Sequence, residues 1–202
     1  YNHSKIGEKE IPVFPTPTLG MLGILKGKSR MMTHDIKQHG QSVFLIGKTT
    51  DDIASSEYLY SFRNIKNAPA TYFNLDEEYD MQQVIIQLIE KGLIASAHDI
   101  SDGGLFITLL ESSMPRNLGF DISTDEDIRK DAFLFGEGQG RAVVSVSEEN
   151  LDAFVDFIAE TGIDFTNLGT VTPGNILIDG EDFGNTSYYK ELYDTALEKI
   201  LN

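Results

Sequence analysis

One short run of polar residues and glycines predicts a junction between a strand and a helix in the middle of this chain. The run is His98-Asp99-Ile100-Ser101-Asp102-Gly103-Gly104-Leu105; an apolar segment, 92–97, precedes it, and a helix-like segment, 105–113, follows it. Exposed backbone N–H groups and the helix dipole favour anions at such a junction, and carboxylates there can hold a metal ion. The run therefore marks a candidate ligand site.

Composition narrows the class of protein. The chain has 202 residues and is 41% hydrophobic, which is enough for a core in one large domain or two small ones. It has no cysteine, which excludes disulfides and cysteine-based zinc sites. A formal net charge of −16 argues against nucleic acid or an anionic membrane as a partner. The sequence has no apolar run of about 20 residues and no signal-peptide pattern, and we expect a cytoplasmic location.

Periodicity and turn signals predict an α+β fold. Residues 76–91 form the clearest helix, because Met81, Val84, Ile85, Leu88 and Ile89 share one face. We expect further helices at 105–113, 147–162 (with Ser147 as N-cap) and 187–201, and strands at 19–25, 42–47, 93–97, 119–123 and 141–147. Segments 168–172 and 175–179 flank Pro173-Gly174, which predicts a hairpin. The mixed order favours a layered α/β sandwich with a mixed sheet over a doubly wound sheet.

The first residues suggest that the chain continues from an upstream domain. The chain begins with Tyr1 rather than Met, and we interpret it as a piece of a longer polypeptide. Pro12, Pro15 and Pro17 exclude a helix there, so residues 1–20 are predicted to be extended. Residues 21–202 are predicted to form a single domain.

The junction offers one set of candidate ligands. Asp99 and Asp102 are three residues apart and could share a magnesium ion with a bound phosphate. Ser101 and the backbone amides of Gly103 and Gly104 could meet phosphate oxygens. The alternative is a loop that only caps the helix, through the side chain of Ser101 or Asp102, with Asp99 bonding to the turn. Spacing alone slightly favours this alternative.

A glycine-rich run before a predicted strand offers a second set. Within Phe135-Gly136-Glu137-Gly138-Gln139-Gly140-Arg141, three side chains supply a carboxylate, an amide and a guanidinium fork that suits phosphate. The run is neither a Walker A loop nor a Rossmann fingerprint. A tight loop or bulge before the strand explains it equally well.

Other signals are weaker. The hydroxyls of Thr16-Pro17-Thr18-Leu19-Gly20 could line a groove, although a rigid edge strand is the favoured interpretation. His3, His34 and His39 do not have metal-ligand spacing. The sequence contains no Gly-x-Ser-x-Gly or Ser-His-Asp arrangement, so we assign no catalytic residue and no metal ligand.

Several phrases, taken in order, resemble the phosphoribosylformylglycinamidine synthase family. They are Tyr1-Asn2, Pro15-Thr16-Pro17-Thr18-Leu19-Gly20-Met21-Leu22-Gly23, Ser56-Glu57-Tyr58, the run 98–105, Asn117-Leu118-Gly119 and the run 134–141. Each phrase is weak alone, and together they are specific. They resemble the C-terminal half of the second of two tandem modules, a module that aminoimidazole ribonucleotide synthetase and selenophosphate synthetase share.

This resemblance implies a fold and an activity. The fold would be that of the aminoimidazole ribonucleotide synthetase C-terminal domain. The whole enzyme would be an ATP-dependent ligase that converts formylglycinamide ribonucleotide to the amidine, with ATP, Mg²⁺ and ammonia from glutamine. Its partners would be upstream domains of the same polypeptide, including a missing ATP-binding domain, and a glutaminase domain or subunit.

The resemblance also implies that this piece is inactive alone. The family's catalytic histidines and most of its ATP and magnesium ligands lie in the N-terminal halves. Where the first module has Glu-Ser-Gln at the substrate phosphate, this chain has Glu137-Gly138-Gln139. Residues expected to bind a nucleotide or phosphate are Asp99, Ser101, Asp102, Gly103, Gly104, Glu137, Gly138, Gln139 and Arg141. The alternatives are the same domain of another enzyme of the superfamily, or a free-standing binding or assembly domain.

Overall fold

The computed structural model describes residues 3–7, 9–12, 18–25, 27–28 and 31–201. It divides into two compact units, 1–31 and 32–202. In the first unit, β1 (His3–Ile6) and β2 (Lys9–Pro12) form an antiparallel pair. The phrase Tyr1-Asn2 and the candidate residues Thr16 and Pro17 lie outside the described residues.

The strand predicted at 19–25 is wrong. Residues 18–25 have no regular secondary structure, and the side chains of Leu19, Met21, Leu22 and Ile24 are almost completely exposed. A strand needs a neighbour for its backbone hydrogen bonds, and the described part of the chain provides none for this segment.

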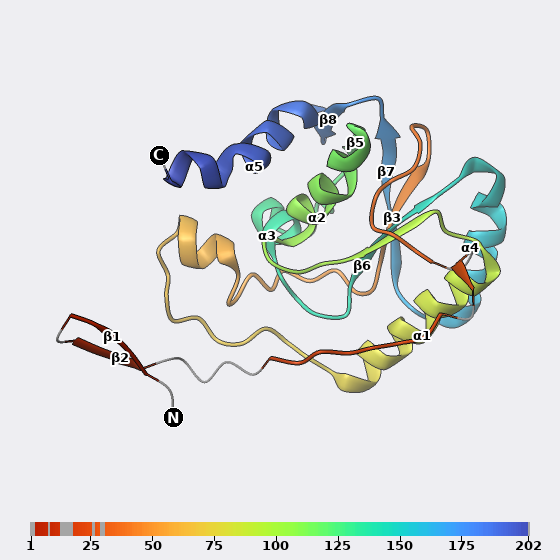
Figure 1. Ribbon diagram of the computed structural model, residues 1–202. Coiled ribbons are helices and arrows are strands. Elements are labelled where there is room, and N and C mark those ends of the chain that lie inside the picture. The colour runs from red at the N-terminus through yellow and green to blue at the C-terminus, as the bar shows by residue number, and fades with distance from the viewer. Residues whose placement is uncertain (1–2, 8, 13–17, 26, 29–30, 202) are drawn as a thin grey trace. The chain divides into compact units, whose positions relative to one another are not determined.

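The second unit contains a seven-stranded mixed sheet (Figure 1). The strand order is β4-β6-β3-β7-β5-β8-β9, and every neighbouring pair is antiparallel except β5 and β8, which are parallel. This confirms the predicted mixed sheet. The strands are β3 (Ser42–Ile46), β4 (Ser96–Asp99), β5 (Gly119–Ile122), β6 (Ala142–Val146), β7 (Phe165–Thr172), β8 (Asn175–Ile178) and β9 (Glu181–Asn185).

Five α-helices accompany the sheet in the described part of the second unit. They are α1 (Leu75–Lys91), α2 (Gly104–Ser113), α3 (Lys130–Phe135), α4 (Leu151–Thr161) and α5 (Thr186–Leu201), with a short π-helix η2 (Tyr58–Phe62) and 3₁₀ turns η3 (Met114–Arg116) and η4 (Glu148–Asn150). The predicted helices at 76–91, 105–113 and 187–201 are confirmed to within one residue. Among the described helices, none is long and apolar enough to cross a bilayer.

The helices cover both faces of the sheet (Figure 1). Val43 and Leu45 of β3 point into a core cluster with α2 and α3, whereas Phe44 and Ile46 point into a second cluster with α1 and α4. This alternation is the period of two that a strand imposes on its side chains. The predicted layered α/β sandwich is therefore confirmed.

The predicted hairpin around Pro173-Gly174 is wrong. β7 and β8 do not pair with each other, because β5 lies between them: Phe120 is opposite Val171 on one side and Ile176 on the other. Inserting β5 buries Phe120 completely, which a simple hairpin would not do.

Two local predictions also need correction. The strand expected at 93–97 runs instead from Ser96 to Asp99, where its backbone pairs with β6, so the junction is shorter than the sequence suggests. The side chain of Ser147 makes no capping hydrogen bond, because the turn η4 separates it from α4.

Candidate functional site

The candidate junction connects the end of β4 to the start of α2. Asp99, Ser101 and Asp102 are exposed, and none of these side chains has a hydrogen bond or ion pair with another described residue. Helix α2 begins at Gly104 with Gly103 as its N-cap and without a side-chain cap. The interpretation in which Ser101 or Asp102 caps the helix is therefore wrong, and both side chains remain accessible to a ligand.

The glycine-rich loop after α3 packs directly on this junction. The Glu137 carboxylate oxygen Oε1 accepts hydrogen bonds from the backbone N–H of Gly103 and of Glu57, each at 2.8 Å. A Cβ atom on Gly104 would lie 2.7 to 2.8 Å from the backbone of Phe135 and Gly136, so only glycine permits this approach. The runs 98–105 and 135–141, which are separate candidates in the sequence, thus form one surface.

The phrase Ser56-Glu57-Tyr58 joins the same assembly. The Tyr58 ring stacks on Phe135, with 5.2 Å between centroids and 6° between the planes. Ser56 is buried, and its hydroxyl donates to the carbonyl of Ile53. Three phrases that carry the family resemblance are therefore neighbours in space, which their spacing in the sequence does not reveal.

Arg141 does not extend from this surface. It is 4% exposed; Nε donates to the Gly138 carbonyl at 3.0 Å and Nη2 to the Gly136 carbonyl at 2.7 Å. Burial lowers the pKa of the Arg141 guanidinium, and the charge of Asp52 partly opposes this. The side chain closes the loop on itself, whereas Gln139, two residues before it, is exposed.

The same loop lines part of a pocket of about 360 Å³. Its walls carry more acidic than basic side chains: Asp52, Glu77, Glu78, Asp80 and Asp164 against Lys48 and Arg141. The rest of the lining includes Gly47, Thr50, Tyr72, Phe73, Asn74, Gly138, Gln139 and Gly140. Oε2 of Glu78 is buried without a hydrogen-bond partner among the described residues. The sequence does not reveal this acidic wall, because its members come from segments far apart along the chain that no local spacing joins.

The residues present do not assemble a magnesium site. Among the described residues, no group of three or more His, Asp or Glu side chains is placed to hold a metal ion. Asp99 and Asp102 could contribute ligands only together with groups from elsewhere. A triphosphate would likewise need cations that Arg141, turned into the loop, does not supply. The chain offers part of a binding surface: two carboxylates, a hydroxyl, an amide and backbone groups.

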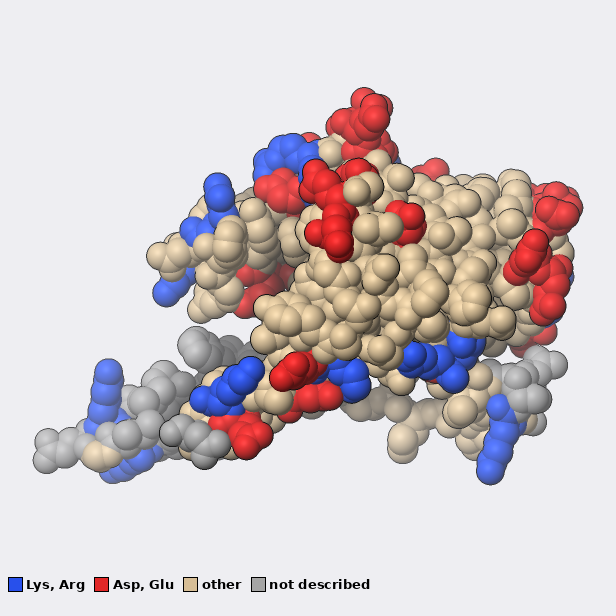
Figure 2. All heavy atoms as spheres, turned by 90° about the horizontal axis from the view of Figure 1, so that it is seen from above, with Lys and Arg blue, Asp and Glu red and all other residues tan. Residues whose placement is uncertain are grey.

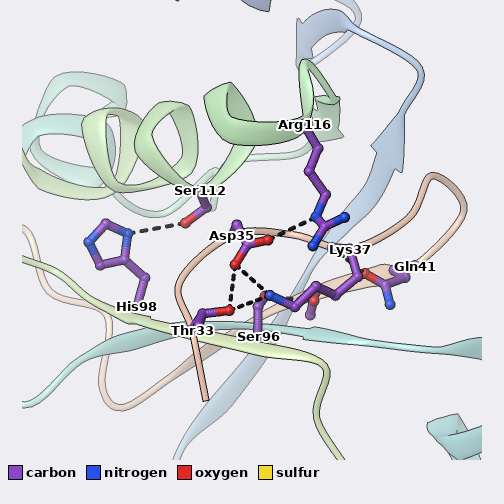
Figure 3. Close-up of polar contacts among 9 residues, drawn as sticks. Thr33, Asp35, Lys37, Gln41, Ser96, His98, Ser112 and Arg116 are labelled. Carbon is purple, nitrogen blue, oxygen red and sulfur yellow. Dashed lines mark hydrogen bonds and ion pairs between the residues drawn. The ribbon is translucent and has the colours of Figure 1, made fainter. Parts of the chain in front are cut away.

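The half-buried His98 side chain is directed at Ser112 of α2 rather than at this surface (Figure 3). Its Nδ1 lies 3.1 Å from the Ser112 hydroxyl, Nε2 lies 3.6 Å from a Glu111 oxygen, and its ring centroid is 5.0 Å from that of His34. His98 packs against α2, so the first residue of the run has a structural role.

The same view shows a network centred on Asp35 (Figure 3). Its carboxylate accepts hydrogen bonds from the Thr33 hydroxyl, the Lys37 ammonium and, at 2.8 Å, Nε of Arg116. Burial raises the pKa of Asp35, but these hydrogen bonds and the Lys37 charge outweigh it and hold the pKa well below its usual range. The network ties residues 33–37 to η3.

The chain matches a family model over residues 38–179: AIR synthase related protein, C-terminal domain. Three curated relatives are each named phosphoribosylformylglycinamidine synthase subunit PurL. The protein from Caldanaerobacter subterraneus is 34% identical over 168 residues, which are 83% of this chain and 23% of the relative. The protein from Leuconostoc mesenteroides is 38% identical over 160 residues, 79% of this chain and 21% of the relative. That from Chlorobaculum tepidum is 32% identical over 213 aligned positions, 100% of this chain and 28% of the relative.

Solved structures show the same fold. Thermotoga maritima PurL complexed with FGAR superimposes with a TM-score of 0.69 at 15% identity, over 81% of this chain and 30% of that one. T. maritima PurL complexed with ATP gives a TM-score of 0.60 at 13% identity, over 79% and 27%. The chain thus spans about a quarter of the length of the curated relatives that it matches.

Proposed function

The chain belongs to the AIR synthase related family, whose C-terminal domain it contains, and on that premise we propose that it is the C-terminal domain of the second module of a phosphoribosylformylglycinamidine synthase. The main support for this proposal is that the chain is 31–38% identical, over most of its length, to proteins of that name. In the whole enzyme, ATP would activate the amide oxygen of formylglycinamide ribonucleotide, and ammonia from glutamine would displace the phosphate. We propose a cytoplasmic location for the whole enzyme.

The domain would contribute a surface to a site that other domains complete. The exposed side chains of Asp99, Ser101, Asp102 and Gln139 are available to a nucleotide or phosphate. The backbone N–H groups of Gly103 and Gly104 are bonded within the chain, to Glu137 and to the Ser101 carbonyl. Structures of the T. maritima relative complexed with ATP and with ADP support a nucleotide as the ligand class. The magnesium ion of the reaction would need ligands from upstream, because the described residues do not group three.

Exposed apolar side chains support upstream domains as partners. Residues 18–25 carry Leu19, Met21, Leu22 and Ile24, each at least 95% exposed. Near the candidate site, Phe62 is 74% exposed and Tyr72 is 61% exposed. Figure 2 shows a face where a broad area without Lys, Arg, Asp or Glu lies between groups of acidic side chains. Apolar side chains that are exposed together, as in residues 18–25, are typical of a surface that a partner covers. A structure described as PurLQS from T. maritima supports a glutaminase as a further partner.

A domain exchange tests the proposal. The matching segment of Leuconostoc mesenteroides PurL, 38% identical, is replaced by this chain in a bacterial strain that lacks its own enzyme. We expect the chimera to restore growth without added purines, because the domain would complete the same active sites. The 202-residue chain alone should release no phosphate from ATP with formylglycinamide ribonucleotide and ammonia.

A matched variant tests whether growth depends on the folded domain. Leu109 is completely buried, so a chimera with Leu109→Asp should not support growth. A soluble, folded chimera that fails to support growth would count against the proposal and favour a free-standing binding domain. Turnover by the isolated chain would contradict its role as a non-catalytic part.

A further inference from the structure

We propose that Glu137 is a positioning residue, a built-in anion that organises the candidate site without contacting its ligand. This inference deepens the proposed function and rests on it, because it concerns the same surface. The resemblance aligns position 137 with a residue at the substrate phosphate in the first module. The geometry of this chain assigns it a different role.

The carboxylate of Glu137 is already engaged by the chain itself. Its Oε1 accepts one hydrogen bond from a residue 34 positions away and one from a residue 80 positions away, both at 2.8 Å. Hydrogen bonds from N–H groups to a carboxylate are stronger than those to a neutral acceptor. A side chain held in this way has a fixed position before any ligand arrives.

Both N–H groups belong to helix starts. Gly103 is the N-cap of α2, and Glu57 is the N-cap of the π-helix η2. The first N–H groups of a helix have no partner within the helix, and an anion there is favoured by the helix dipole. The side chains of the two N-cap residues make no capping hydrogen bond; in η2, the Ser56 hydroxyl accepts from the backbone N–H of Leu59, at 3.3 Å. The Glu137 carboxylate therefore satisfies the N–H groups of Gly103 and Glu57, which no local side chain reaches.

This arrangement excludes the two N–H groups from ligand binding. A phosphate aimed at the Gly103 amide would meet a negative charge 2.8 Å from that nitrogen, and like charges repel. The phosphate must instead use exposed groups that can donate hydrogen bonds, the Ser101 hydroxyl and the Gln139 amide. The role of Glu137 is to hold three segments in register: 56–58, the β4–α2 junction and the loop 136–141.

Amide hydrogen exchange, measured by NMR on the chain with inorganic phosphate as the binding probe, tests this role. Glu137→Ala should speed exchange of the Gly103 and Glu57 amides by about tenfold or more, because their acceptor is lost. Glu137→Gln keeps an acceptor oxygen but loses the charge, so the same two amides should exchange faster than in the parent chain and more slowly than in Glu137→Ala. Exchange at Val144, inside β6, should not change in either variant.

Gln139→Ala is the matched control, because Gln139 lies in the same loop and is exposed; it should leave both amides unchanged. The proposal is overturned if exchange of the two amides in Glu137→Gln stays at the parent rate, which decides the question even if Glu137→Ala does not fold. It is also overturned if either variant abolishes phosphate binding while exchange stays at the parent rate, because Glu137 would then be a ligand. Failure of the domain exchange would count against the proposed function, whereas the exchange rates of these two amides judge the role of Glu137 on their own.

Discussion

Arg141 and Glu137 have side chains that the sequence marks as suited to a phosphate ligand. In the structure, Arg141 donates to two carbonyls of its own loop, and Glu137 accepts from two backbone amides of other segments. The residue types show that both side chains are polar, but they do not show which group each side chain contacts. The contacts follow from the fold, since a charged side chain packed within a domain must satisfy its hydrogen bonds there. Gln139, Asp99 and Asp102 are exposed and remain free for a ligand.

Asp35 gives a residue-scale prediction about pH. Asp35→Asn should lower the free energy of unfolding by about 2 kcal/mol at pH 7, because charge-assisted hydrogen bonds from Lys37 and Arg116 are lost. The folded-state pKa of Asp35 lies below its unfolded value, so this contribution is complete above about pH 5 and declines as pH falls below about 4. Urea unfolding at several pH values measures the difference.

The matched control for Asp35 is Asp156→Asn on the exposed surface of α4. It should change the free energy of unfolding by less than about 0.5 kcal/mol. A gap between Asp35→Asn and the parent chain that stays constant from pH 7 to pH 3 would show that the carboxylate charge is not the cause.

At the scale of elements, the best-predicted feature is helix α1. Its apolar period, the αL glycine Gly92 at its end and the acidic residues of its first turn are all local in the sequence. The neighbours of a strand are not local in this way. β5 lies between β7 and β8 in the sheet, although it precedes them by some 50 residues in the sequence. A turn such as Pro173-Gly174 permits a hairpin but does not require one. The position of β5 is set by the burial of Phe120 and Ile122.

The start of α1 gives a prediction at this scale. The Asn74 side chain accepts hydrogen bonds from the backbone N–H of Asp76 at 3.0 Å and of Glu77 at 3.4 Å. Asn74→Ala should therefore lower the free energy of unfolding by about 1 kcal/mol. Asn74→Ser, which retains a capping oxygen, should lose less than half as much. Equal losses in the two variants, measured by urea unfolding, would mean that the cap does not stabilise the helix.

For the whole molecule, every strand of the seven-stranded sheet and both core clusters lie within residues 32–202. We expect a chain that begins at Met32 to unfold cooperatively, with a free energy of unfolding within about 1 kcal/mol of the longer chain. A chain that begins at Met21, where the sequence placed the domain boundary, should behave in the same way. Circular dichroism during urea unfolding provides the comparison.

A chain truncated at its C-terminus is the control for the chain that begins at Met32. A chain that stops at Ile178 loses β9 and α5, including Phe183 and Tyr189, which pack on the first core cluster, and the buried Thr186. It should lose its cooperative transition. If the chain that begins at Met32 unfolds without a cooperative transition, residues 1–31 are needed for a stable fold.

The sequence by itself determined the helices with a clear apolar period, such as α1, and the family. Helical period, capping residues and the ordered phrases depend on neighbours a few residues apart or on the phrases themselves, so they can be read without a fold. Tertiary structure alone decided that β5 separates β7 from β8, that Glu137 joins Gly103 to Glu57, and that Arg141 is withdrawn from the surface. These features depend on contacts between distant segments, where burial and hydrogen-bond satisfaction outweigh the preferences of any single stretch of chain.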